Sequence, residues 1–125
     1  MNKDIVSTPQ APAAIGPYSQ AVRTGLVVFT SGQIGLDPAT GQLVEGFEAQ
    51  VRRAFANLEA VAQAAGGSLA HAVKFTLYLT DLAQFATVNQ IMGELLPQPY
   101  PARSTVGVAS LPRGAAFEVE AILVL

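Results

Sequence analysis

The chain has 125 residues, which suits a single domain, and charged residues make up only 13% of it while hydrophobic residues reach 50%. Its formal net charge is -2 with scattered basic residues, a pattern that argues against a nucleic-acid-binding protein or a partner recruited by charge. With no cysteine and one histidine, the composition excludes disulfides, thiolate catalysis and a Cys- or His-rich metal site within one chain.

Strands and turns are predicted for the first part of the chain. Residues 2–8 (NKDIVST) favour a short strand, and the Pro- and Gly-containing stretch APAAIGPYSQ favours a loop. AVRTGLVVFTSGQ predicts a β-hairpin, because two β-rich segments flank Thr24 and Gly25. LDPATGQL predicts a turn that begins at Asp37 and Pro38.

The clearest predicted helix covers residues 46–65. Apolar residues recur there at helical spacing from Phe47 to Ala65, charged and amide side chains fall mainly on the opposite side, and a Gly-Gly pair is expected to end it. A strand of period two follows in AHAVKFTLYLTDL. One face of this strand is expected to carry Val73, Phe75, Leu77 and Leu79, and the other Lys74, Thr76, Tyr78 and Thr80.

A second helix is predicted over about residues 82–96, with Asp81 as its N-cap. Its expected apolar stripe consists of Phe85, Val88, Met92 and Leu95. Three prolines, at 97, 99 and 101, are expected to end the helix and begin an extended loop. Residues 103–109 and 116–125 are predicted to be two more strands, joined by the turn LPRG.

This order of elements predicts an α+β fold: one domain over residues 1–125, with a single mixed β-sheet and both helices packed on one face. The second sheet face is expected to mix polar and apolar side chains, and such a face suits a subunit interface with clefts. Its predicted occupants are Lys74, Thr76, Tyr78, Glu118, Glu120, Ile122 and Val124. The low charge content also favours an oligomer, with an alanine-rich monomer as the alternative.

The sequence does not indicate a membrane protein. No apolar run approaches the ~20 residues of a transmembrane helix, and the stretch MNKDIVSTPQ lacks the apolar centre of a signal peptide. The expected location is the cytosol.

Arg103 is the first candidate for chemistry. Its guanidinium offers a planar set of donors that matches a carboxylate, and it lies where the proline-rich loop meets a strand. The alternative is a surface arginine, or one paired with a nearby acid.

Glu118 and Glu120 share one face of an otherwise apolar strand, where carboxylates are costly unless they are paired, solvated or functional. They could form salt bridges with Arg103, Arg113 or Lys74. Alternatively, one carboxylate beside an apolar wall could hold or activate a water molecule.

Weaker candidates lie elsewhere. Ser31 and Gly32 end a strand, where glycine permits close approach to a ligand or simply a bulge. Tyr18 could present a hydroxyl from its loop or only pack, and Asn89 could bond locally. His71 is expected to be an ordinary residue at a strand entry, without a Ser-His-Asp triad.

Four segments together resemble the RidA (YjgF) family of imine deaminases in order and spacing: AIGPYSQAV, TSGQIGLDPATG, DLAQFATVNQIM and YPARSTVGVASLPRGAAFEVEAI. The resemblance covers about residues 4–124. Its most specific part is the string P-A-R-S, followed by L-P and then an E-x-E strand.

The resemblance implies a chorismate-mutase-like fold and a homotrimer whose sheets face inward, with three sites at the subunit interfaces. It implies hydrolysis of reactive 2-imino acids, 2-iminopropanoate and 2-iminobutanoate, to 2-oxo acids and ammonia. Such imines are released by pyridoxal-phosphate enzymes such as threonine and serine dehydratases. No cofactor or metal is implied.

Carried over by position, the resemblance implies that Arg103 binds the substrate carboxylate and that Glu118 orients the attacking water. Other positions that it places in the pocket are Tyr18, Ser31, Gly32, Asn89 and Thr105. Relatives often have cysteine where this chain has Thr105, a departure that bears on pocket shape more than on activity. Met92 similarly bears on the apolar wall and on substrate preference.

Two other functions stay open. A non-catalytic trimer that binds 2-oxo acids or similar small carboxylates would need Arg103 but not Glu118. Ribonuclease or translation-inhibiting activity has been attributed to some relatives, but the net charge of -2 and the scattered basic residues argue against it.

Overall fold

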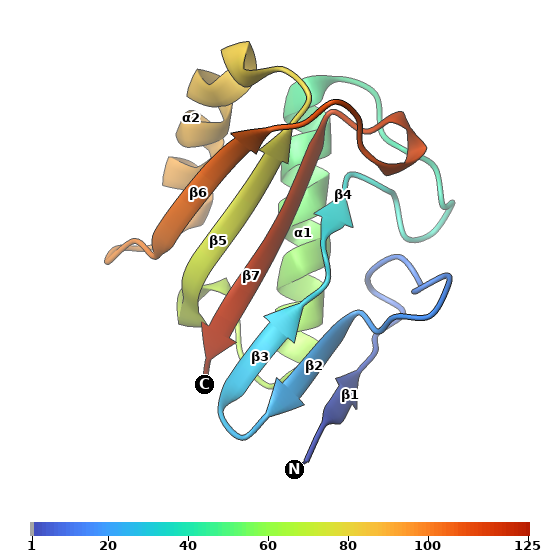
Figure 1. The fold of residues 1–125 in the computed structure, drawn as a ribbon, viewed down its shortest axis with the longest axis vertical. Helices are drawn as coiled ribbons and strands as arrows, with labels where there is room; N and C mark the ends of the chain where they lie inside the picture. The colour runs from blue at the N-terminus through green and yellow to red at the C-terminus, as the bar shows by residue number, and fades with distance from the viewer. Residues whose placement is uncertain (1) are drawn as a thin grey trace.

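A computed structural model of the chain describes residues 2–125, in which seven strands form one mixed sheet (Figure 1). The strands are β1 (Asp4–Val6), β2 (Ala21–Thr24), β3 (Val27–Thr30), β4 (Gln33–Ile34), β5 (Ala72–Leu79), β6 (Ala102–Gly107) and β7 (Phe117–Val124). Their spatial order is β1-β2-β3-β7-β5-β6, and β4 also pairs with β7. Only the β5–β6 pair is parallel. The predicted hairpin is confirmed as β2 and β3.

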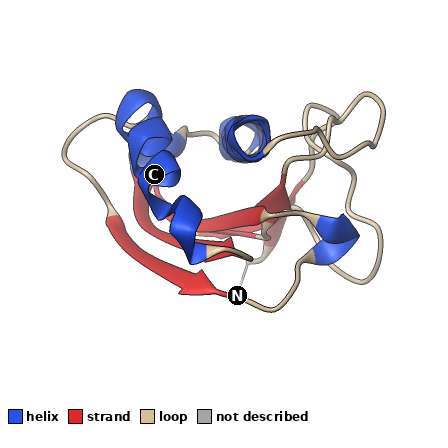
Figure 2. Cartoon of the chain, turned by 90° about the horizontal axis from the view of Figure 1, so that it is seen from above, coloured by secondary structure: helices blue, strands red, loops and turns tan. Residues whose placement is uncertain are grey.

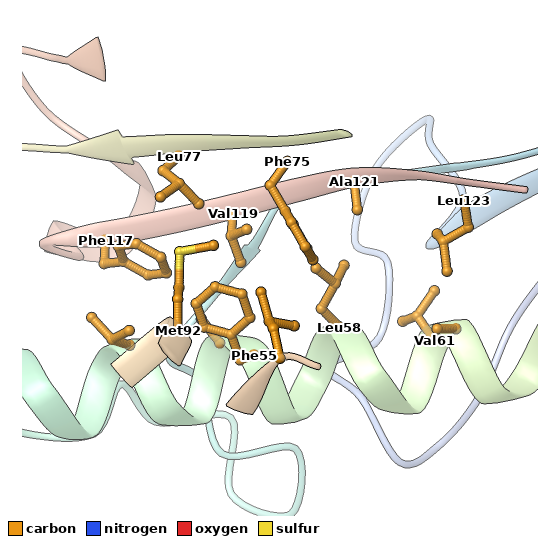
Figure 3. Close-up of a cluster of buried hydrophobic side chains, with 14 of the residues drawn as sticks. Phe55, Leu58, Val61, Phe75, Leu77, Met92, Phe117, Val119, Ala121 and Leu123 are labelled. Atoms are coloured by element: carbon orange, nitrogen blue, oxygen red, sulfur yellow. The ribbon is translucent and has the colours of Figure 1, made fainter. Parts of the chain in front are cut away.

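The two helices, α1 (Phe47–Ala64) and α2 (Phe85–Leu95), both cover one face of the sheet, as Figure 2 shows. The predicted α+β fold is therefore confirmed. The hydrophobic core lies between α1 and the central strands (Figure 3). Phe55 of α1 packs against Phe75 of β5 and Phe117 of β7, and its ring centroid lies 5.8 Å from the centroid of each. Such contacts hold the helix to the sheet by burying large aromatic areas.

The end of α1 follows from its glycine pair. Gly66 has a φ of +103°, which glycine adopts without the steric cost that a Cβ would bring. The amide of Gly67 then donates to the carbonyl of Ala62 at 3.0 Å. Arg23 of β2 donates to the carbonyl of Ala65 at 2.9 Å, so it satisfies another carbonyl at this helix terminus.

Several predicted details are wrong for local reasons. Val73 is exposed, because the β5–β7 register shifts between Ala72 and Lys74 and interrupts the alternation. Leu95 is 44% exposed, and Ile91 is the buried member of the α2 stripe in its place.

Element ends also differ slightly from the predictions. The Asp81 side chain accepts a hydrogen bond from the amide of Ala83, as a cap should, but the turn it caps is a 3-10 turn, Leu82–Gln84. β6 ends at Gly107, two residues earlier than predicted.

The face of the sheet away from the helices, called the open face below, mixes polar and apolar side chains. Glu118, Glu120, Ile122 and Val124 of β7 point to it, because the residues between them are buried under the helices. Phe29, opposite Ile122 in the neighbouring strand, is 49% exposed. In the part of the chain that the structure describes, no helix is long and apolar enough to cross a membrane.

Candidate functional site

Arg103 lies near the start of β6, the edge strand beside α2. It pairs in parallel register with Phe75, so its side chain projects from the helix-covered face of the sheet. Its Nη1 donates to Oδ1 of Asn89 at 2.6 Å, and its guanidinium carbon lies 4.9 Å from the ring centroid of Phe85. The same Nη1 also lies 3.7 Å from the sulfur of Met92. Helix α2 therefore holds the guanidinium in place.

No acid neutralises Arg103 within residues 2–125, where the ion pairs are those of Arg52 with Glu48 and Glu94. An arginine held by an amide oxygen and an aromatic face keeps donors for a planar anion. The alternative of an Arg103–acid pair is wrong within the described chain, and Arg103 is suited to bind a small carboxylate.

A cavity of about 440 Å³ lies beside Arg103, between α2, β6 and the loop that joins them. We call it the Arg103 cavity. It is lined by Asn89, Met92, Gly93, Leu96, Tyr100, Pro101 and Arg103.

Glu118 lies on β7 and points to the open face, opposite Ile34 of β4 and Tyr78 of β5. Its carboxyl is half-buried, and this burial raises its pKa, with the negative charge of Glu120 adding to the effect. No cation pairs with Glu118 among residues 2–125. A carboxyl with a raised pKa binds a proton more readily, which suits it to general-base chemistry.

Gly32 is needed for the position of Glu118. A Cβ at residue 32 would lie 2.8 Å from the carboxyl carbon of Glu118, closer than such atoms approach. Next to it, the hydroxyl of Ser31 donates to the carbonyl of Ser19 at 2.6 Å and ties this strand end to the Tyr18 loop. The Tyr18 hydroxyl accepts from the amide of Ile15 at 3.3 Å.

A second cavity, of about 330 Å³, contains these groups and is called the Glu118 cavity below. It is lined by Pro12, Ala13, Ile15, Tyr18, Gln20, Gly32, Gln33, Ile34, Leu36, Pro112, Arg113 and Glu118. Arg113 was considered in the sequence only as a partner for an acid, not as a site residue. Its left-handed backbone (φ 61°) and its hydrogen bond to the carbonyl of Gly41 place it in this wall, and neither feature has a clear sequence signal.

Glu120 is held differently from Glu118. The hydroxyl of Tyr78 donates to Oε1 of Glu120 at 2.5 Å, a hydrogen bond that raises the pKa of Tyr78 to about 12. Lys74 instead contacts the hydroxyl of Ser104 at 3.2 Å. The predicted alternative of salt bridges from the two glutamates to Arg103, Arg113 or Lys74 is therefore wrong within the described residues.

The predicted site residues fall into two groups in one chain. Arg103, Asn89 and Thr105 lie at β6 and α2, whereas Tyr18, Gly32 and Glu118 line the other cavity. Strand β5 separates β6 from β7 (Figure 1). Arg103 and Glu118 project from opposite faces of the sheet, because Arg103 pairs with the buried Phe75 whereas Glu118 lies between the buried Phe117 and Val119. The predicted site residues of one chain therefore lie in two separate groups, called the predicted half-sites below.

Thr105 points to the same side of β6 as Arg103, two residues along the strand. Its hydroxyl is buried and has no hydrogen-bond partner within residues 2–125. As for metals, the described residues contain no group of three or more His, Asp or Glu side chains placed to hold an ion.

Comparison with known proteins gives consistent matches over nearly the whole chain. A family model described as endoribonuclease L-PSP matches residues 8–125. A 2-iminobutanoate/2-iminopropanoate deaminase of Dermatophagoides farinae is 44% identical over 98% of this chain and 97% of its own length.

Solved structures agree with this match. RidA from Psychrobacter sp. PAMC 21119 has a TM-score of 0.96 and 50% identity, covering 98% of this chain and 99% of its own. E. coli TdcF with bound serine has a TM-score of 0.91 and 44% identity, with 98% and 99% covered.

Proposed function

The chain belongs to the endoribonuclease L-PSP family, which includes the RidA deaminases, and on this premise we propose that it hydrolyses reactive 2-imino acids to 2-oxo acids and ammonia. The reaction cleaves a carbon–nitrogen bond with water. The proposed substrates are small imines such as 2-iminopropanoate and 2-iminobutanoate, and the cytosol remains the predicted location.

The observation that carries this proposal is the state of Glu118. It is a half-buried carboxyl without a cation partner in residues 2–125, packed against a glycine that leaves it room and facing a cavity. Its raised pKa reflects a cost that a purely structural role would not explain. A water molecule beside such a carboxylate can lose a proton to it.

We infer that each complete site combines the two half-sites of neighbouring subunits in a homotrimer. Arg103 and Asn89 of one subunit would face Tyr18, Gly32 and Glu118 of the next. The mixed open face and the low charge content support such contacts between copies. Tyr100 in the wall of the Arg103 cavity and Tyr18 in the wall of the Glu118 cavity are both exposed, so both cavities open at the surface of the single chain.

The proposed chemistry needs only positioning and one proton carrier. Arg103 binds the carboxylate of the protonated imine, and Glu118 accepts a proton from water as its oxygen adds to the imine carbon. The resulting carbinolamine receives that proton on nitrogen. The carbon–nitrogen bond then breaks and releases ammonia, the hydroxyl gives its proton to that ammonia, and a 2-oxo acid and ammonium result.

A coupled assay tests the proposal. An amino-acid oxidase generates the imine, semicarbazide traps it, and the purified protein is added. We expect the semicarbazone signal to fall in proportion to the amount of protein. An unchanged signal would rule out deamination of the imine supplied.

Replacing Glu118 by Gln separates catalysis from binding. We expect the rate of hydrolysis to fall on the order of 100-fold or more, because the proton acceptor is lost. Binding of a 2-oxo acid, measured by calorimetry, should persist, since Arg103 is untouched. Unchanged hydrolysis in this variant would instead favour a small-carboxylate-binding trimer, a function that the serine-bound TdcF relative makes worth testing.

The family description also names a ribonuclease activity, and the charge of this chain argues against it. Proteins that bind RNA through phosphates concentrate basic residues and bind strongly salt-dependently. Filter binding of single-stranded RNA at low and high salt is expected to show no specific retention.

A further inference from the structure

The Arg103 cavity is larger and more apolar than carboxylate binding requires. Beyond Arg103 and Asn89, its walls are the side chains of Met92, Leu96 and Tyr100, together with Gly93 and a proline. At about 440 Å³ it falls in the size range of pockets that enclose small organic ligands. No step of the proposed hydrolysis uses this apolar part.

Gly93 leaves one wall of the cavity open. It lies one helical turn after Asn89 on α2, on the stripe that borders Arg103. A Cβ at residue 93 would meet nothing within 4 Å. Glycine in a helix interior costs stability relative to alanine, and no backbone constraint requires it here, since Gly93 is not among the glycines with positive φ.

The covalent structure of a 2-imino acid determines what can fill this space. The carboxylate and the side chain are attached to the same imine carbon. When Arg103 binds the carboxylate, the side chain must begin close to the guanidinium. The imine carbon must stay accessible to the water beside Glu118, so the side chain is directed away from that half-site. The Arg103 cavity is the adjoining space on the Arg103 side.

We propose that the Arg103 cavity receives the substrate side chain, so that the enzyme acts on 2-imino acids with large apolar side chains, and that Gly93 sets their size limit. This inference rests on the proposed function. Met92 and Leu96 are 7% and 6% exposed, so they form a firm apolar floor, and Tyr100 adds an aromatic wall.

A pair of substrates and a pair of variants test the assignment. Each buried methylene strengthens binding roughly fourfold, and the leucine-derived imine has three more side-chain carbons than the alanine-derived imine, so its kcat/KM is expected to be higher by roughly 60-fold. Gly93→Leu fills the cavity while improving helix propensity, so the variant should fold. The variant should lower kcat/KM for the leucine-derived imine about 10-fold or more. Its kcat/KM for the alanine-derived imine should stay within about threefold of the wild-type value.

Gln90→Leu is the matched control, because Gln90 is exposed on the same helix and does not line the cavity. It should leave both rates unchanged. Equal effects of Gly93→Leu on the two imines, or no effect on either, would overturn the proposal.

Binding of 4-methyl-2-oxopentanoate and pyruvate provides a readout independent of turnover. Calorimetry should show that Gly93→Leu weakens only the larger 2-oxo acid, and equal changes in both affinities would again overturn the assignment. This binding comparison decides the role of the cavity even if neither imine is hydrolysed, a result that would overturn the deaminase function alone.

Discussion

Glu118 is a single residue whose ionised form lowers the stability of the fold. Its carboxyl is partly removed from water, beside a second carboxylate and without an ion pair among residues 2–125. Burial of this kind favours the protonated form, and folding therefore costs more when the group is ionised. The proposed catalytic role requires the ionised form.

The burial of Glu118 predicts that the difference in stability between the wild type and Glu118→Gln depends on pH. Because the pKa in the folded state lies above the ordinary 4.5, the folded state holds a proton that the unfolded state has released. The contribution of Glu118 to the free energy of unfolding therefore falls as pH rises from 4.5 through the folded value. Thermal unfolding at equal protein concentration should give similar Tm values near pH 4 and a higher Tm for the variant at pH 7. A lower Tm at pH 7 would show that the carboxylate is stabilised by a group outside the chain described here.

Replacing Glu120 by Gln tests the charge that acts on Glu118. Removing that charge removes one of the two causes of the raised pKa, so the pKa of Glu118 should fall. The acid limb of the kcat/KM profile is then expected at lower pH. Other titratable groups near Glu118 are Tyr78 across the strand pair and Tyr18 and Arg113 in the cavity wall.

Tyr78→Phe is the companion variant for this profile. It removes the hydrogen bond to Glu120 but leaves the carboxylate charge, so its acid limb should stay at or above the wild-type position. An acid limb that does not move in Glu120→Gln would mean that Glu118 does not control the rate.

At the scale of elements, hydrophobic periodicity was sufficient to predict α1 and β5. The failures came where a neighbouring strand or helix changes the local geometry. Val73 is exposed because the pairing of β5 with β7 shifts register at this point, and β7 lies some 50 residues later in the chain. The position of Leu95 depends on where α2 leaves the sheet. Neither follows from local pattern, because side-chain burial is decided by tertiary packing.

Close approach of two elements makes Gly35 sensitive to substitution. A Cβ there would lie 2.7 Å from the Cα of Gln50 and 2.8 Å from its carbonyl oxygen, both backbone atoms of α1. Gly35→Ala should therefore push α1 away from the loop after β4 and cost about 1–3 kcal/mol in the free energy of unfolding. Gly93→Ala is the matched control and should be neutral or stabilising by about 0.5–1 kcal/mol, since its Cβ meets no atom. Urea denaturation measures both, and equal stability of the two variants would contradict the reported close approach.

For the whole molecule, the resemblance implied sites between subunits, but it did not indicate how far apart the predicted site residues lie within one chain. The motifs that carry Arg103 and Glu118 indicated both residues by resemblance, and strand alternation placed Glu118 on the open face, but the sequence provided no information on the face that Arg103 takes. That depends on β6 pairing in parallel with β5 while β7 lies antiparallel on its other side. Within one chain, β5 lies between the strands that carry Arg103 and Glu118, and this separation is the reason for the proposal that the two residues meet between subunits.

A shared site requires the oligomer. Static light scattering at micromolar concentration is expected to give three times the 13.0 kDa mass of the chain. In a monomer, the Arg103 group that binds the substrate carboxylate would lack a Glu118 group beside it to activate water.

The most direct test of the account is subunit complementation. Chains carrying Arg103→Ala and chains carrying Glu118→Gln are co-expressed with different tags, and mixed trimers are purified and assayed for imine hydrolysis. Each variant alone should be nearly inactive. Each mixed trimer should restore about a third of wild-type activity, because one of its three interfaces pairs an unmodified Arg103 with an unmodified Glu118. Mixed trimers as inactive as either parent would contradict a deaminase site shared between subunits.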